Sequence, residues 1–158
     1  MKKIISLVLA LVCILLALVG CSTGTPTGNN SDKAERFHEL VSDTQDLLDE
    51  YADDIYSCWY DYIYEDEYSS VDSAIIAAVL MNSDNIDAIE ANNESIKELY
   101  KEVRDGELED EVKEVMQAYN EYYSFVMEVS GSFNSYSASK ETIKKNLANA
   151  LKNLEFEL

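Results

Sequence analysis

The sequence predicts an all-α protein, an up-down antiparallel four-helix bundle that follows a lipoprotein signal peptide and a flexible tether. The 158 residues include one proline and five glycines, which disfavours a turn-rich β fold. Four segments repeat apolar or small residues at alternating steps of three and four, which is the spacing of one helix face. The connections between the segments are short, so consecutive helices are expected to be antiparallel neighbours in one bundle, residues 33–158.

The first two segments are the longer pair, and each could span about 35 residues, or ~52 Å of helix. Ser69 or Ser70 is a plausible N-cap of the second segment, and Gly106 suits a left-handed position after its end. The first stripe runs through Phe37, Val41, Thr44, Leu48, Tyr51, Ile55, Cys58 and Tyr62. The second runs through Ile75, Val79, Asn82, Ile86, Ile89, Asn93, Ile96, Tyr100 and Val103.

The third and fourth segments are shorter and are separated by Ser130 and Gly131. Ser132 is the expected N-cap of the fourth. An alternative is a three-helix bundle, in which the last two segments continue as one helix through Gly131. The third stripe runs through Leu108, Val112, Val115, Tyr119, Tyr122, Val126 and Val129, and the fourth through Phe133, Tyr136, Lys140, Ile143, Leu147, Ala150 and Leu154.

Two features interrupt the second stripe. The sequence Met81-Asn82-Ser83-Asp84 combines poor helix formers with good N-caps, so we expect the helix to kink or restart there. Asn93 lies within the stripe, where a buried amide requires hydrogen-bond partners and commonly fixes the register of the helices.

The first twenty residues are expected to be a signal peptide. Lys2 and Lys3 precede an apolar run that is short for a membrane span, and the run ends in Leu18-Val19-Gly20-Cys21. This ending looks like a bacterial lipobox, in which Cys21 is acylated and the chain is cut before it. Residues 21–32 then form the lipidated cysteine and a polar tether, with a reach of about 18 Å. A plain secretory signal or an uncleaved anchor helix is the alternative.

The charge is strongly negative and unevenly distributed. The chain carries 31 acidic and 12 basic residues, which excludes nucleic acid as a partner because phosphates attract basic surfaces. Residues 32–130 are acidic and residues 131–158 are nearly neutral. This pattern predicts a solvated acidic surface with one near-neutral helix packed beside it. An acidic face directed at a cationic partner, or loosely held divalent cations, is the second interpretation.

The sequence gives little support to catalysis, metal binding or a cofactor. Glu35 and His38 have the spacing of a di-iron helix motif, but that site needs a second such motif and the chain has no second histidine. We therefore expect His38 to be an exposed side chain. Cys58 is the one thiol left in the mature chain once Cys21 is acylated, and its stripe position predicts a buried, unreactive residue. We predict no catalytic residue, no metal ligand and no cofactor.

Aromatic residues concentrate at the end of the first segment. Trp59 widens the predicted core stripe beside Cys58, whereas Tyr60 and Tyr64 turn progressively outward at 100° per residue. Tyrosine rings four residues apart can form a contact surface, because they bury much area at low entropic cost. Packing and anchoring of the following loop is the alternative role. Trp59, Tyr60 and Tyr64 are the candidate contacts for a partner or ligand.

The lipobox, the stretch from Cys58 to Tyr64 and the stretch from Gly131 to Ser137 together resemble small helical lipoproteins of low-GC Gram-positive bacteria. The resemblance would cover residues 1–158. It implies the location and the helical fold and supplies no catalytic residue, because the family's function is uncharacterised.

We therefore predict a membrane-anchored extracytoplasmic lipoprotein, attached through Cys21, that acts as a non-enzymatic interaction module for another envelope protein. One alternative is a small-ligand carrier with an aromatic pocket near Trp59. Another is a lipoprotein that excludes phage or confers immunity to a bacteriocin. An enzyme is the class the sequence supports least.

Overall fold

The computed structural model describes residues 30–158, with side chains from residue 31, and this part of the chain is all-helical with no strand. The prediction of an all-α protein is confirmed. Cys21, the signal peptide and most of the tether lie outside the described residues. No helix in the described part is long and apolar enough to cross a membrane. The helices are α2 (Asn30–Tyr64), α3 (Val71–Met81), α4 (Ser83–Val103), α5 (Glu109–Met127) and α6 (Phe133–Glu157).

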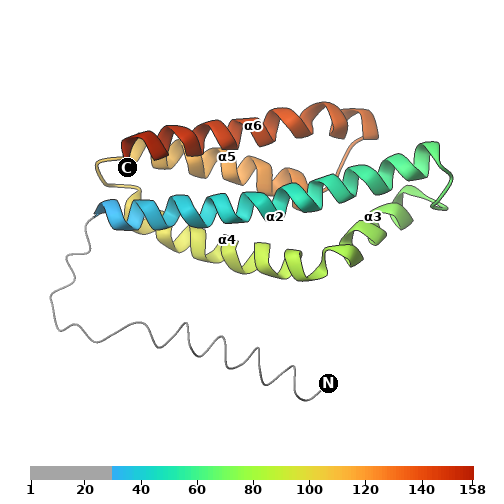
Figure 1. The fold of residues 1–158 in the computed structure, drawn as a ribbon, viewed down its shortest axis with the longest axis horizontal. Helices are drawn as coiled ribbons and strands as arrows, with labels where there is room; N and C mark the ends of the chain where they lie inside the picture. The colour runs from blue at the N-terminus through green and yellow to red at the C-terminus, as the bar shows by residue number, and fades with distance from the viewer. Residues whose placement is uncertain (1–29) are drawn as a thin grey trace, which may run out of the picture.

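Helix α2 is the central element of the fold and contacts each of the other four helices. Helices α3 and α4 lie one after the other along α2, and α5 and α6 pack against each other (Figure 1). The turn between α2 and α3 and the connection between α5 and α6 lie at one end of the molecule (Figure 1). The start of α2 lies at the other end, where Lys33 forms a 3.1 Å ion pair with Glu102 near the end of α4.

One hydrophobic core runs between the helices. The first predicted stripe is buried from Phe37 to Cys58, and the third is buried from Val112 to Val126. Tyr122 and Tyr136 are buried with phenol groups that reach polar partners on α2. The largest fully buried side chains are Tyr119, Tyr122, Tyr136, Phe37, Leu48, Ile55, Ile89, Ile96, Leu147 and Leu154.

The predicted interruption of the second segment is confirmed, because α3 ends at Met81 and α4 begins at Ser83. Asn82 between them has φ −108° and ψ 19° and is 2 % exposed. Its side-chain nitrogen donates to Asp54 Oδ2 at 2.8 Å and to the carbonyl of Ala78 at 3.0 Å. The break is therefore fixed to α2 by a buried amide that an apolar residue could not replace.

Two serine caps begin the helices at the turn end of the molecule. Ser70 accepts a hydrogen bond from the N–H of Ser73 at 3.1 Å, and Ser132 accepts one from the N–H of Ser135 at 3.2 Å. Each partner serine bonds back to the cap's own N–H, which makes two capping boxes. The N-cap predictions for the second and fourth segments are confirmed.

The predictions about the two glycine positions had different outcomes. The left-handed position expected at Gly106 is wrong: α4 ends at Val103, and its cap Arg104 has ordinary helical angles. Gly131 has φ +86°, and the chain leaves α5 at Met127 before α6 begins at Phe133. The alternative in which the last two segments form one continuous helix is therefore wrong.

Candidate interaction surface at the end of α2

The aromatic cluster lies at the end of α2, beside the first turn of α6. Tyr60 is 39 % exposed and Tyr64 is 58 % exposed, as their helical positions predict. The two ring centroids are 4.6 Å apart, and each lies 6.3 Å from the ring of Phe133. Phe133 of α6 therefore packs beside both exposed tyrosines.

Trp59 occupies a different position from these tyrosines. It is 5 % exposed, and its ring packs edge-on against Phe133 at 6.0 Å and beside Tyr136 at 5.9 Å. Burying an indole in this way contributes mainly to the core, so Trp59 offers little area to a partner. Of the three candidate contact residues, the two tyrosines are accessible and the tryptophan is buried.

Tyr136 explains why α6 lies where it does. Its ring stacks on Phe125 with centroids 4.6 Å apart, and its hydroxyl donates to the carbonyl of Ala52 at 3.2 Å. Burial raises the pKa of the Tyr136 phenol. The contact joins α5, α6 and α2 and holds Phe133, three residues earlier, against the aromatic cluster.

Open depressions adjoin the cluster and share Trp59, Val71 and Gly131 as lining residues. Together they form a groove between the end of α2, the start of α3 and the connection between α5 and α6. Most of the lining side chains are apolar or aromatic. The groove is lined by Trp59, Tyr62, Ile63, Tyr64, Val71, Asp72, Ile75, Ile76, Val129, Ser130, Gly131, Ser132, Phe133 and Asn134.

Helix α3 continues this apolar surface outward. The stripe expected at Ile75 and Val79 is not the buried face: Val79 is 39 % exposed, whereas Ala74 and Ala78 are fully buried against the rest of the protein. The alanines face the core because their small side chains let α3 approach α2 closely. Because α3 has apolar residues all around it, the core cannot cover all of them, and several of the larger ones are exposed. Exposed fractions are 58 % for Ile76, 72 % for Leu80 and 64 % for Met81.

We call this region the distal surface, because it lies along the part of α2 that leads to Tyr64, toward the end opposite Asn30 (Figure 1). It comprises the groove and the exposed side chains beside it. Sequence reasoning found its tyrosines but missed the contribution of α3. The run from Ala74 to Met81 could have indicated this contribution. It has no polar residue, so a helix formed by it must leave some apolar side chains exposed. The exposed side chains are Tyr60, Ile63, Tyr64, Ile76, Val79, Leu80 and Met81.

The charges around the distal surface are acidic. Asp72 lines the groove, and Glu65, Asp66 and Glu67 are exposed in the turn between α2 and α3. Asp66 has φ +54°, a left-handed conformation that aspartate adopts more readily than most residues. No lysine or arginine lies among the residues that line the groove.

The nearest cations on α6 are engaged with acids of α2. Lys140 pairs with Asp53, and its ammonium also lies 5.0 Å from the centre of the Tyr56 ring. Lys144 forms a 2.8 Å ion pair with Asp49, and this hydrogen-bonded carboxylate raises the pKa of the lysine. The expected packing of a near-neutral helix beside acidic neighbours is therefore observed.

The turn that borders the groove is held by one contact from an aromatic side chain. The hydroxyl of Tyr68 donates to the sulfur of Cys58 at 3.6 Å. That hydrogen bond and the neighbouring thiol raise the pKa of Tyr68 to about 12. Cys58 is 3 % exposed, so it is buried as its stripe position predicts.

The polar groups inside the core all have partners in the described residues. Asn93 accepts a hydrogen bond from the Tyr119 hydroxyl at 3.4 Å, so the buried amide links α4 to α5. Thr44 accepts one from Asn92 at 3.1 Å, which links α2 to α4. These bonds agree with the expectation that the stripe asparagine fixes register.

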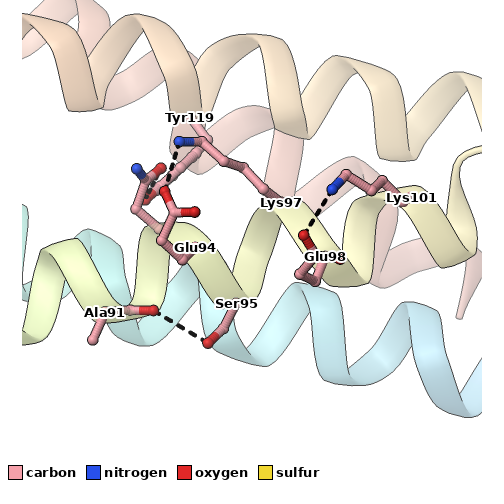
Figure 2. Close-up of polar contacts among 8 residues, drawn as sticks. Ala91, Glu94, Ser95, Lys97, Glu98, Lys101 and Tyr119 are labelled. Atoms are coloured by element: carbon pink, nitrogen blue, oxygen red, sulfur yellow. Dashed lines mark hydrogen bonds and ion pairs between the residues drawn. The ribbon is translucent and has the colours of Figure 1, made fainter.

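The lysines of α4 lie in its second half and pair within the helix. Figure 2 shows Lys97 bonded to Glu94 at 3.0 Å and Lys101 bonded to Glu98 at 2.7 Å. These side chains are exposed, so the pairs contribute little to stability. They belong to the part of α4 that leads toward Lys33 and the start of α2, away from the distal surface.

His38 is half-buried rather than exposed, because it sits beside the core stripe of α2. Within residues 30–158, no group of three or more histidine, cysteine, aspartate or glutamate side chains is arranged to hold a metal ion.

Comparisons with known proteins found no matching protein family, no similar curated protein and no similar solved structure.

Proposed function

We propose that this protein is an extracytoplasmic lipoprotein, acylated at Cys21, that acts as a non-enzymatic interaction module for another envelope protein. The observation that carries the proposal is the location of exposed apolar area. Seven of the nine exposed large apolar side chains in residues 31–158 belong to the distal surface. Such a concentration on a soluble domain is typical of a contact site.

The direction of α2 relates this surface to the proposed anchor. A helix of 35 residues extends about 52 Å. The tether would join the domain at Asn30, one end of that helix, and Tyr64 ends the other. An anchor at residue 21 would thus leave the distal surface free to meet a partner away from the bilayer.

We also propose the finer description of the fold, an up-down antiparallel four-helix bundle in which α3 and α4 together form the second rod. The short connections and the packing of α2 against α3, α4 and α6 support it. This architecture agrees with the resemblance to small helical lipoproteins of low-GC Gram-positive bacteria, which remains a proposal.

A protein partner suits the distal surface better than a small ligand does. Small-molecule sites enclose most of their ligand, whereas the depressions beside Trp59 are open to solvent and continue onto the outer face of α3. An open apolar groove that continues onto an exposed helix face is instead the kind of surface that an extended or helical segment can occupy.

The test is recovery of a crosslinked partner from membranes of cells that express the full chain. The Tyr60→Ala/Tyr64→Ala variant removes the two exposed rings and is expected to lose most of the crosslinked partner. Phe156→Ala is the matched control, because Phe156 is 76 % exposed and lies at the end of α6, away from the distal surface. Equal recovery with the tyrosine variant and the control would contradict the proposal.

A further inference from the structure

We infer that the distal surface binds a cationic amphipathic helix of its partner, with the apolar face of that helix in the groove and its lysines or arginines against the acidic rim. This inference rests on the proposed function and specifies the chemistry of the partner. Three observations support it: the form of the apolar surface, the absence of basic residues from the groove lining, and the net charge of the chain.

The apolar surface has the form that an amphipathic helix requires. Ile76 lines the groove and Leu80 lies one turn further along the exposed face of α3, so the two form one row. Ile63 and Tyr64 border the groove on the side of α2. A helix laid between these borders could bury apolar residues spaced by three and four against both.

The charge around this surface has one sign over a long stretch of sequence. No lysine or arginine occurs between Arg36 and Lys97, a stretch that contains most of α2, all of α3 and the first two thirds of α4. Asp72 lines the groove, and Glu65, Asp66 and Glu67 are exposed in the turn between Tyr64 and Val71, which are themselves lining residues. Opposite charges on a partner would therefore gain attraction here without competing with a cation of this chain.

The same charges argue against two other occupants. A second copy would bring another acidic rim against this one, and the formal charge of −19 on each chain opposes that approach. An anionic lipid surface would be repelled in the same way. A partner that combines apolar side chains with positive charge satisfies both the groove and the rim.

The experiment measures binding of a designed peptide to the full chain, purified from membranes and held in nanodiscs of phosphatidylcholine. The probe is a fluorescent helix of about 18 residues, five turns, with leucine on one face and lysine on the other. The comparison peptide keeps the leucines and replaces every lysine with glutamate, and empty nanodiscs supply the blank. We expect saturable micromolar binding of the lysine peptide and no measurable binding of the glutamate peptide.

Two variants locate the binding. Ile76→Ala/Leu80→Ala removes exposed apolar groups and is expected to weaken binding about tenfold or more, because both side chains would be buried in the complex. Phe156→Ala is the matched control and should change the affinity by less than about twofold.

A second pair of variants tests the charge. Glu67→Gln/Asp72→Asn should lower the affinity for the lysine peptide about threefold and make the binding less sensitive to salt. Glu114→Gln/Glu121→Gln removes the same amount of negative charge from exposed positions on α5. This control should reduce the affinity for the lysine peptide by less than Glu67→Gln/Asp72→Asn does.

Several results would overturn the inference. Equal binding of the two peptides would contradict a cationic helix as the partner, and so would unchanged affinity in Ile76→Ala/Leu80→Ala. The proposed interaction module would still stand if Tyr60→Ala/Tyr64→Ala loses its crosslinked partner. A concentration-dependent dimer that Ile76→Ala/Leu80→Ala abolishes would assign the surface to a second copy. Insertion of Ile76 and Leu80 into nanodiscs of anionic lipid would assign it to the membrane. Failure of both the peptide and the partner assays would contradict the proposed function itself.

Discussion

Alkaline unfolding should be driven by three tyrosines that are buried between the helices. Tyr119, Tyr122 and Tyr136 are each at most 2 % exposed, and burial raises the pKa of all three phenols. In Tyr122 the hydrogen bond to Asp49, with its hydroxyl 2.6 Å from the carboxylate, raises the pKa further. The unfolded chain has ordinary tyrosines, which titrate near pH 10.

The sign and the size of the effect follow from proton linkage. Below about pH 10 both states hold the three protons, so the full contribution to stability is present. Above it the unfolded state loses protons that the folded state keeps, and the free energy of unfolding falls as pH rises through the native pKa values. Each tyrosine contributes a slope of about 1.4 kcal/mol per pH unit, so three contribute about 4 kcal/mol per unit. A domain that is stable by ~5–15 kcal/mol should therefore unfold within a few pH units.

The perturbation is Tyr122→Phe, measured by urea unfolding followed by circular dichroism from neutral to strongly alkaline pH. At neutral pH the variant should lose about 1.5–3 kcal/mol, because a hydrogen bond to an ionised carboxylate is removed. Above pH 10 its slope should be smaller by about 1.4 kcal/mol per unit, because one titrating group is gone. Lys144 still faces Asp49 in both proteins, so its own titration cancels in the comparison.

Tyr64→Phe is the control, because it deletes the same hydroxyl from a side chain that is 58 % exposed, and it should change the free energy of unfolding at neutral pH by less than about 0.5 kcal/mol. An unchanged slope in Tyr122→Phe would refute the reasoning. So would phenolate absorbance that appears near pH 10 for every tyrosine while the helices are still folded.

Three further predictions concern stability and can be checked by chemical unfolding. Ala78→Leu should cost about 1–3 kcal/mol or more, since this fully buried alanine sets the approach of α3, whereas Leu80→Ala on the exposed face should cost little. Gly131→Ala should cost about 1–2 kcal/mol, because φ is +86° there and a Cβ would lie 2.8 Å from Ser135 Oγ. Ser132→Ala should cost about 1 kcal/mol by removing the cap of α6, and an equal loss in Ser139→Ala would contradict that role.

The features that the sequence predicted correctly depend on local rules. Ser70 and Ser132 cap helices because short side-chain acceptors satisfy free N–H groups, and Asn82 interrupts a helix because its amide competes with the backbone. The outward turn of Tyr60 and Tyr64 follows from helical spacing alone.

The features that the sequence did not predict depend on contacts between distant segments or on local ambiguity. Helix α3 is apolar on every side, so no periodic signal says whether Ala74 and Ala78 or Ile75 and Val79 face the core. The groove is formed by residues from α2, α3 and the connection before α6, which no single segment reveals. A glycine such as Gly106 can end a helix in a left-handed conformation. Here α4 ends earlier, at Val103, and its C-cap Arg104 has right-handed helical angles.

The proposed role depends on a lipid at Cys21 that attaches the helical domain to the outer face of the membrane. Mass spectrometry of the protein from membrane and culture-fluid fractions tests it directly. We expect a mature chain in the membrane fraction that begins at an acylated Cys21, and we expect the Cys21→Ser variant to lack the acyl modification. A chain found in the culture fluid with an unmodified Cys21, or one that keeps residues 1–20 in the membrane, would contradict it.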